Sequence, residues 1–240
     1  MEEFLALDLE TSGLSPEKDR IIEIGAIKYR GEQAIDTYSC LICLPEKLPE
    51  RIVALTGITD EMLAQGLPER EAILGFLEFA KDMPVLLGHN ITFDYSFLKV
   101  AALRYGQSFE RQGMDTLLLS RRLHTELPSR TLEAMCVHYG IEQKQAHRAL
   151  DDAKTAWELY RCLRKEFPEQ ELYPAPLIYH EKKREPITPK QKKYLLDLVK
   201  YHKIEFMQEI DLLTKSEASR MIDKIILAHG QRPKTASSDK

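Results

Sequence analysis

The sequence predicts a mixed α/β fold, with helices on both faces of one sheet, followed by a small helical hairpin. Three observations indicate this fold class. Three strand-like segments come first, and only a short turn at Gly31 separates the second from the third. Helix and strand patterns then alternate as far as residue 167, which is typical of a sheet covered on both faces. A proline-rich stretch then precedes two short helical patterns.

Each predicted element follows from a local pattern. The first strand is an apolar run over 4–10, and 21–30 and 33–42 continue it as antiparallel neighbours. Apolar residues at helical spacing predict a helix over 70–82, and Gly106 predicts the end of another that begins near Phe93. The remaining elements are a buried strand over 83–90, a short strand near 112–116, and helices that begin near residues 116, 131 and 150.

Composition, prolines and helix-capping residues predict the domain organisation. A chain of 240 residues that is 43% hydrophobic can bury a full core. We expect a catalytic-size domain over 1–167, a proline-rich linker over 168–186, a helical hairpin over 187–230 and a disordered polar tail over 231–240. Thr188 before a proline and Thr214 before Glu217 predict the starts of the two hairpin helices. The stripes expected to bury each other are Leu195, Leu196 and Val199 on one helix and Ala218, Met221, Ile222 and Ile225 on the other.

Charge, hydropathy and cysteine content indicate in which cellular compartment the protein works and whether it binds zinc. The net charge is −4, with acidic residues in excess before about residue 180 and basic residues in excess after it. The sequence has no long uncharged apolar run and no leader pattern, so we expect a cytoplasmic protein without a membrane partner. Cys40 and Cys43 form a CxxC pair inside a predicted strand, where residues three apart face opposite sides. The pair is interpreted either as reduced cysteines in a strand or as part of a zinc site, and we favour reduced cysteines.

Two carboxylates in the first strand point to a site. Asp8 and Glu10 are separated by the strand's side-chain period of two, so both project from one face. Like charges about 5 to 7 Å apart repel by about 2 to 3 kcal/mol at an effective dielectric of about 20. A purely structural strand has no reason to carry this cost. We therefore expect a positive group between them.

Further acidic residues and a histidine could meet this pair. Asp94 follows the predicted strand at the amino end of a helix, where a helix cap and a ligand are alternatives. His147 and Asp152 can share a cleft if His147 lies in the loop before the last helix and Asp152 in its first turns. A loop histidine beside a solvated first turn is the alternative. Asp115 and Asp151 are left off the site, because Asp115 is placed to cap a helix.

The four carboxylates Asp8, Glu10, Asp94 and Asp152 predict a site for two divalent cations. Their combined charge of about −4 is neutralised by two such ions, and all-oxygen ligands favour Mg²⁺ or Mn²⁺ over zinc. Two such ions can bind the attacking and the leaving oxygen of a displacement at phosphorus. His147 is placed to take a proton from the attacking water, because imidazole titrates near neutral pH.

Three motifs also resemble a known family. "LDLETSGL", "HNITFD" and "HRALDDA" are similar to the three motifs of the DEDDh 3′-5′ exonucleases, which include the proofreading epsilon subunits of bacterial replicative polymerases. The resemblance implies a ribonuclease-H-like fold with a five-stranded mixed sheet. It also implies that the four carboxylates hold the metals and that His147 is the general base. The substrate-binding residues that it implies are Thr11, Ser12, Gly13, Leu14, Leu55, Thr56, His89, Asn90 and Phe93.

Three hypotheses about function follow. The leading one is a two-metal 3′-5′ exonuclease that releases nucleoside monophosphates from single-stranded DNA, in proofreading or repair, with a polymerase or another replication or repair protein as a possible partner. The second is the same chemistry on RNA, which the sequence does not separate from the first. The third is an inactive nucleic-acid or polymerase-binding module. Lysines on the first hairpin helix fit either a phosphate contact or a solvated helix face: Lys190, Lys192, Lys193, Lys200 and Lys203.

Overall fold

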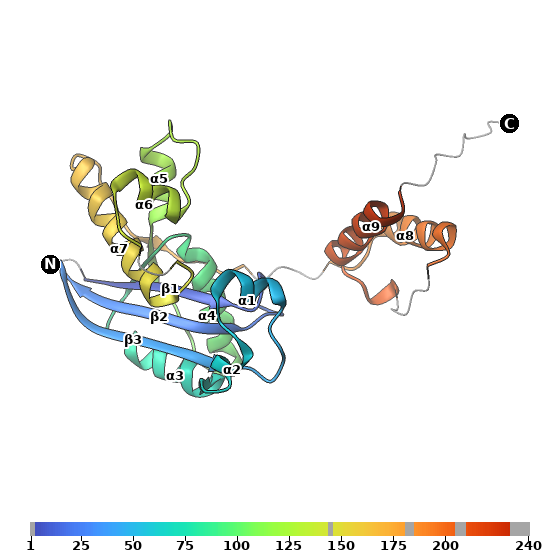
Figure 1. Cartoon of the computed structure of the whole chain (residues 1–240), viewed down its shortest axis with the longest axis horizontal. Helices are drawn as coiled ribbons and strands as arrows, with labels where there is room; N and C mark the ends of the chain where they lie inside the picture. The colour runs from blue at the N-terminus through green and yellow to red at the C-terminus, as the bar shows by residue number, and fades with distance from the viewer. Residues whose placement is uncertain (1–2, 144–145, 181–184, 205–209, 231–240) are drawn as a thin grey trace. The chain divides into compact units, whose positions relative to one another are not determined.

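A computed structural model describes residues 3–143, 146–180, 185–204 and 210–230 of the chain (Figure 1). The chain divides into two compact units, 1–179 and 180–240. The polar tail predicted over 231–240 lies outside the described residues. None of the helices in the described ranges is long and apolar enough to cross a membrane.

The first unit is built on a mixed sheet with the strand order β4-β3-β2-β1-β5-β6-β7. Strands β1, β2 and β3 form an antiparallel meander, whereas β5 and β6 continue from β1 in parallel. Two-residue strands, β4 and β7, extend the five longer strands at the two edges. The strand bounds are Glu3–Thr11, Ile21–Arg30, Gln33–Cys43, Leu67–Pro68, Val85–Gly88, Gln112–Asp115 and Ala175–Pro176 for β1 to β7.

Helices cover both faces of this sheet (Figure 1). Helices α3 and α4 share a core with one face of β1 and β2, and α7 packs on the other face. Short helices α1 and α2 form a smaller apolar cluster with Ile22 at the end of the meander. The bounds of α1 to α7 are Glu50–Thr56, Asp60–Leu63, Glu69–Phe79, Ile91–Arg104, Thr116–Leu123, Leu132–Tyr139 and Ala149–Glu166.

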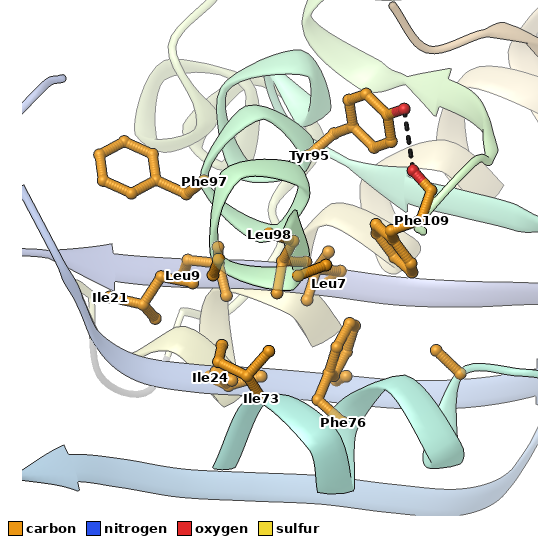
Figure 2. Packing of buried hydrophobic residues seen from close by; sticks show 14 of the residues in the cluster. Leu7, Leu9, Ile21, Ile24, Ile73, Phe76, Tyr95, Phe97, Leu98 and Phe109 are labelled. Atoms are coloured by element: carbon orange, nitrogen blue, oxygen red, sulfur yellow. Dashed lines mark hydrogen bonds between the residues drawn. The ribbon is translucent and has the colours of Figure 1, made fainter. Parts of the chain in front are cut away.

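Alternation along β1 separates two cores. Leu5, Leu7 and Leu9 are buried with α3 and α4 on one face. Figure 2 shows Leu7 and Leu9 facing Leu98 of α4, with Phe76 of α3 below and the Tyr95 hydroxyl donating to the Phe109 carbonyl at 3.1 Å. The even-numbered residues of the strand face α7 instead, beginning with Phe4 and Ala6. Asp8 and Glu10 continue this second set of positions.

Helix α7 packs on the sheet through a buried stripe of alanine and aromatic residues. The stripe comprises Ala149, Ala153, Ala156, Trp157 and Tyr160, all of which are buried. The Trp157 ring stacks on Tyr29 of β2 with ring centroids 4.3 Å apart. Because the alanines add little bulk, the first turns of the helix lie close to the sheet. This close approach brings the start of α7 to the carboxyl end of β1.

Some elements differ from the prediction. The helix expected from Phe93 begins at Ile91 with Asn90 as its N-cap, so Asp94 lies in the first turn rather than at the cap. Gly106 has φ 70° and follows the C-cap Tyr105. Helices α1 and α2 were not predicted, because seven and four residues are too short to show a helical period. Within the described residues, the other predicted helices and strands are present with ends shifted by a few residues.

The second unit contains helices α8, Pro189–His202, and α9, Lys215–His229, with a 3₁₀ turn at Ile210–Leu212. Thr188 and Thr214 each form a complete capping box, as predicted for Thr214. The core differs from the predicted stripe in one position: Leu198 is buried, whereas Leu196 is 45% exposed. Leu195 and Val199 stay in this core, so the buried face is turned by only about 50° toward Leu198, where Leu213 packs as well as α9.

Candidate active site

The candidate site begins at the carboxyl end of β1. Glu10 is buried and Asp8 is half-buried, and both occupy positions on the face of β1 that packs against α7. Asp8 lies opposite Gly25 of β2, and Glu10 lies opposite Glu23. A register shift after Glu10 ends the regular pairing at the next residue. The strand therefore delivers both carboxylates to the point where the chain leaves the sheet.

Asp94 reaches this end of the sheet from α4. The helix follows β5, which runs parallel to β1 as its neighbour. The Asp94 side chain is buried, and its Oδ1 accepts a hydrogen bond of 3.1 Å from the backbone N–H of Leu9. Because Leu9 lies between Asp8 and Glu10, this bond fixes Asp94 against the strand that carries both. The sequence suggested a cap or a ligand, and the structure shows that Asp94 does not cap the helix.

His147 and Asp152 come from the entrance to α7. His147 lies in the turn before the helix with φ 62°, and Asp152 lies in its first turn. The backbone N–H of His147 donates to Asp152 Oδ2 at 3.0 Å, and the Gln143 amide donates to Oδ1 at 2.6 Å. One side-chain ligand atom from each of Glu10, His147 and Asp152 lies within 4.8 Å of the other two. The turn therefore achieves the convergence that a continuous helix would prevent.

The electrostatics of the four carboxylates are unfavourable without a cation. Burial, followed by the charges of Asp94 and Asp152, raises the pKa of Asp8 well above its usual value. Burial and the charge of Asp152 raise the pKa of Glu10 to about 7. Burial also raises the pKa values of Asp94 and Asp152. Each group destabilises the ionised form of its neighbours, so the cluster has a strong preference for positive charge.

This donor set fits divalent cations that prefer oxygen ligands. The carboxylates of Asp8, Glu10, Asp94 and Asp152 supply the oxygens, and their mutual repulsion is relieved when cations bind. A second group, His124, His138 and Glu166, also brings possible ligand atoms within 4.8 Å. There the Tyr139 hydroxyl lies 2.6 Å from both His124 Nε2 and Glu166 Oε2. Hydrogen bonds already engage His124 and Glu166 of that group, so the first cluster is the stronger candidate for cations.

The acidic residues excluded on sequence grounds have other contacts. Asp115 is the N-cap of α5, and its Oδ1 accepts from the N–H groups of Leu117, Leu118 and Asn90. Asp151 lines a shallow hollow on α7 with Glu142, Lys154, Thr155 and Glu158. The role predicted for Asp115 as a cap is confirmed.

Glu23 and Arg148 are polar residues near the site that the sequence analysis missed. Glu23 is 2% exposed, and its carboxylate binds the Arg148 guanidinium through Nε at 3.1 Å and Nη2 at 2.7 Å. The signal was present as a single glutamate inside the apolar run "IIEIGAI" of β2. Its partner is 125 residues away in sequence, so the pair could not be found from local spacing.

The residues predicted to bind substrate fall into two groups. Leu14 is 79% exposed and Leu55 is 53% exposed, and the Asn90 side chain is also exposed. Phe93 is half-buried, with its ring 5.0 Å from that of Phe97. The others have hydrogen bonds within the protein or little exposed surface: Thr11, Ser12, Gly13, Thr56 and His89. Substrate binding by this set stays a prediction.

Comparison with known protein families shows which family the chain belongs to. Residues 5–160 match the family model RNase_T, described as Exonuclease. The chain belongs to this exonuclease family. Similar proteins include the PolC-type DNA polymerase III of Caldanaerobacter subterraneus, 37% identical over 158 residues, or 66% of this chain and 11% of that protein. The Bacillus subtilis PolC-type enzyme is 36% identical over 166 residues, or 68% of this chain and 12% of that protein. The chain thus matches about a tenth of the length of these relatives.

Solved structures share the fold of the first unit. E. coli Exonuclease I in complex with a dT13 oligonucleotide superposes with a TM-score of 0.59 at 22% identity, over 70% of this chain and 42% of that one. The nuclease domain of 3′hExo, a DEDDh family member bound to rAMP, gives a TM-score of 0.58 at 17% identity, over 73% and 97%. The predicted ribonuclease-H-like fold is confirmed. This likeness in fold agrees with membership of the exonuclease family.

Proposed function

We propose that this chain is a 3′-to-5′ exonuclease that removes nucleotides one at a time from single-stranded DNA with the help of two divalent cations, Mg²⁺ or Mn²⁺. The observation that carries the proposal is the convergence of four carboxylates and one imidazole at the carboxyl end of β1. The raised pKa values of the four carboxylates indicate a cluster that requires cations. Membership of the exonuclease family supports the hydrolysis of a phosphodiester.

The side chains have distinct roles in this proposal. Asp8, Glu10, Asp94 and Asp152 would hold the cations, which when bound supply charge that stabilises the attacking and leaving oxygens. His147 is exposed and lies beside Glu10 and Asp152. Its imidazole takes the proton from the attacking water. Because Asp152 accepts a hydrogen bond from the His147 backbone, one residue both holds a cation and orients the base.

The DNA substrate and the polymerase partner rest on the relatives. The similar proteins are DNA polymerases of the PolC type, and the similar structures include Exonuclease I with a dT13 strand. We therefore propose a DNA end as the substrate and proofreading or repair as the role, with a replication protein as partner. The exposed Leu14 and Leu55 offer apolar surfaces for an unstacked base.

A time course on labelled ends tests this proposal. A 5′-labelled single-stranded DNA and the RNA of the same sequence are incubated with Mg²⁺ or Mn²⁺, and parallel reactions contain EDTA or the variant Asp8→Ala. We expect a ladder that shortens from the 3′ end on DNA and is absent with EDTA or the variant. A faster ladder on RNA would instead indicate an exoribonuclease. Activity that survives Asp8→Ala would refute the site.

A 3′-blocked oligonucleotide and a circular single strand serve as substrate controls. Neither has a free 3′ hydroxyl end, so an exonuclease of the proposed polarity leaves the circle intact. Cleavage of the circle would indicate an endonuclease. Absence of cleavage on every linear substrate would favour an inactive binding module.

A further inference from the structure

The turn that carries His147 is held from one side by β2. Glu23 of β2 forms hydrogen bonds to the side chain of the next residue, Arg148, and to the backbone N–H of Ala149 at 3.1 Å. These contacts join the first residue of α7 and the residue before it to the sheet. Because both carboxylate oxygens are used, the contact restrains rotation as well as distance.

A second contact on the same strand brings the backbone close. Gly25 lies two residues beyond Glu23 on β2, so both occupy the face that packs against α7. A Cβ atom at Gly25 would lie 2.2 Å from the carbonyl carbon of Ala149 and from the nitrogen of Leu150. The start of α7 therefore lies directly on the backbone of β2. If the contact with Glu23 were lost, the start of α7 could not move closer to β2, because no space remains at Gly25.

His147 itself has an unfavourable backbone conformation. Its φ of 62° lies in the left-handed region, which costs a residue with a side chain about 1 kcal/mol or more. Such a conformation persists only where neighbouring contacts impose it. Asp152 restrains the backbone N–H of His147, and Glu23 restrains the two residues that follow it. The backbone on both sides of the His147 side chain is therefore restrained by a carboxylate.

We propose that Glu23 and Arg148 are positioning residues that hold the His147 turn so that its imidazole stays beside Glu10 and Asp152. This inference rests on the proposed function, because His147 acts there as the base. Neither residue needs to touch the substrate or a cation for this role. The guanidinium also balances the buried carboxylate, so the pair restrains the turn without adding net charge to the site.

Arg148→Ala tests the role of the pair. It removes the guanidinium while leaving Glu23 able to accept from the backbone N–H of Ala149, and urea unfolding of the variant measures the stability lost when the buried carboxylate loses its partner. We expect kcat to fall about 10- to 100-fold with little change in KM, because the base is misplaced while the carboxylates remain. Arg161→Ala is the matched control, since Arg161 forms an ion pair with Glu32 at 3.2 Å from the same helix. That control should retain full kcat.

The same substitution in a His147→Ala background separates positioning from general stability. If Arg148 acts through His147, Arg148→Ala should cause less than about a twofold further loss once the imidazole is gone. An equal loss in both backgrounds would overturn the proposal, as would unchanged kcat in the single variant. Arg148→Lys, which keeps the charge but not the two-point contact, gives an independent check and should lose part of kcat.

Amide hydrogen exchange gives a readout that does not require activity. In Arg148→Ala we expect faster exchange of the His147 and Ala149 amides, with unchanged exchange in β1 and α4. If wild-type protein proves inactive, the proposed function fails, and the exchange experiment still shows whether the pair holds the turn. Unchanged protection of both amides would overturn the restraint itself.

Discussion

Glu10→Gln should stabilise the metal-free protein at alkaline pH while abolishing hydrolysis. Burial and the charge of Asp152 raise the pKa of Glu10 from 4.5 to about 7. A carboxyl group whose pKa is higher in the folded state binds its proton more tightly there, so stability is lost as pH rises from 4.5 through about 7. Glutamine has the same shape without the charge. The variant should therefore escape this loss.

The size of the effect follows from the shift. The ionised Glu10 destabilises the folded state by about 3 kcal/mol at pH 8 and by about 1 kcal/mol at pH 5. The stability difference between Glu10→Gln and wild type should thus grow by about 2 kcal/mol between these two pH values. Divalent cations reverse the penalty in wild type, because they favour the ionised form.

Urea unfolding in EDTA, followed by tryptophan fluorescence, measures this difference. Trp157 is the one tryptophan of the chain and lies in α7, so its signal reports on the first unit alone. Glu46→Gln is the matched control, since Glu46 is exposed, and it should leave the pH dependence unchanged. Added Mg²⁺ or Mn²⁺ at pH 8 should stabilise wild type more than Glu10→Gln.

The reasoning would be refuted by a variant that is destabilised equally at pH 5 and pH 8. That result would mean that the surroundings of Glu10 do not raise its pKa and that the carboxylates do not repel one another. Equal stabilisation of wild type and variant by cations would mean that Glu10 does not contribute to their binding.

Three further predictions concern the surroundings of the site. Asp94→Ala should be less stable than Asp94→Asn by about 1 to 3 kcal/mol in urea unfolding, because only alanine removes the acceptor of the buried Leu9 N–H; equal stabilities would contradict this. Gly25→Ala should destabilise the first unit by about 1 to 3 kcal/mol or more and lower kcat, because its Cβ meets the backbone of α7; normal stability would show that the helix can move away. Leu14→Ala should raise KM for single-stranded DNA several-fold while changing stability by less than about 0.5 kcal/mol, since Leu14 is 79% exposed; an unchanged KM would remove Leu14 from the substrate site.

Much of the candidate site could be predicted because its signals are local. Asp8 and Glu10 share a face through the period of two along a strand, and this holds in the structure. The placement of His147 in a loop before α7 is also confirmed. The start of α4 was predicted two residues late, because Asn90, with φ 72°, caps the helix without a side-chain hydrogen bond.

The features that were missed depend on residues far apart in sequence. Helices α1 and α2 pack with Ile22 of β2 through Ile52, Val53 and Leu63, contacts that no local pattern predicts. The buried face of α8 includes Leu198 and excludes Leu196 because Leu213 and α9 together define the core of the second unit. In each case the local pattern allowed more than one outcome, and packing selected one.

By itself, the sequence determined the candidate groups for the chemistry: the carboxylates and the imidazole, their order along the chain, and the strand and helix ends that present them. Only the tertiary structure decided how they meet. The approach of α7 to Gly25, the left-handed turn at His147 and the contact between Glu23 and Arg148 all require β2 and α7 to be packed together. The physical reason is that side-chain periodicity acts over a few residues, whereas these contacts join segments more than a hundred residues apart.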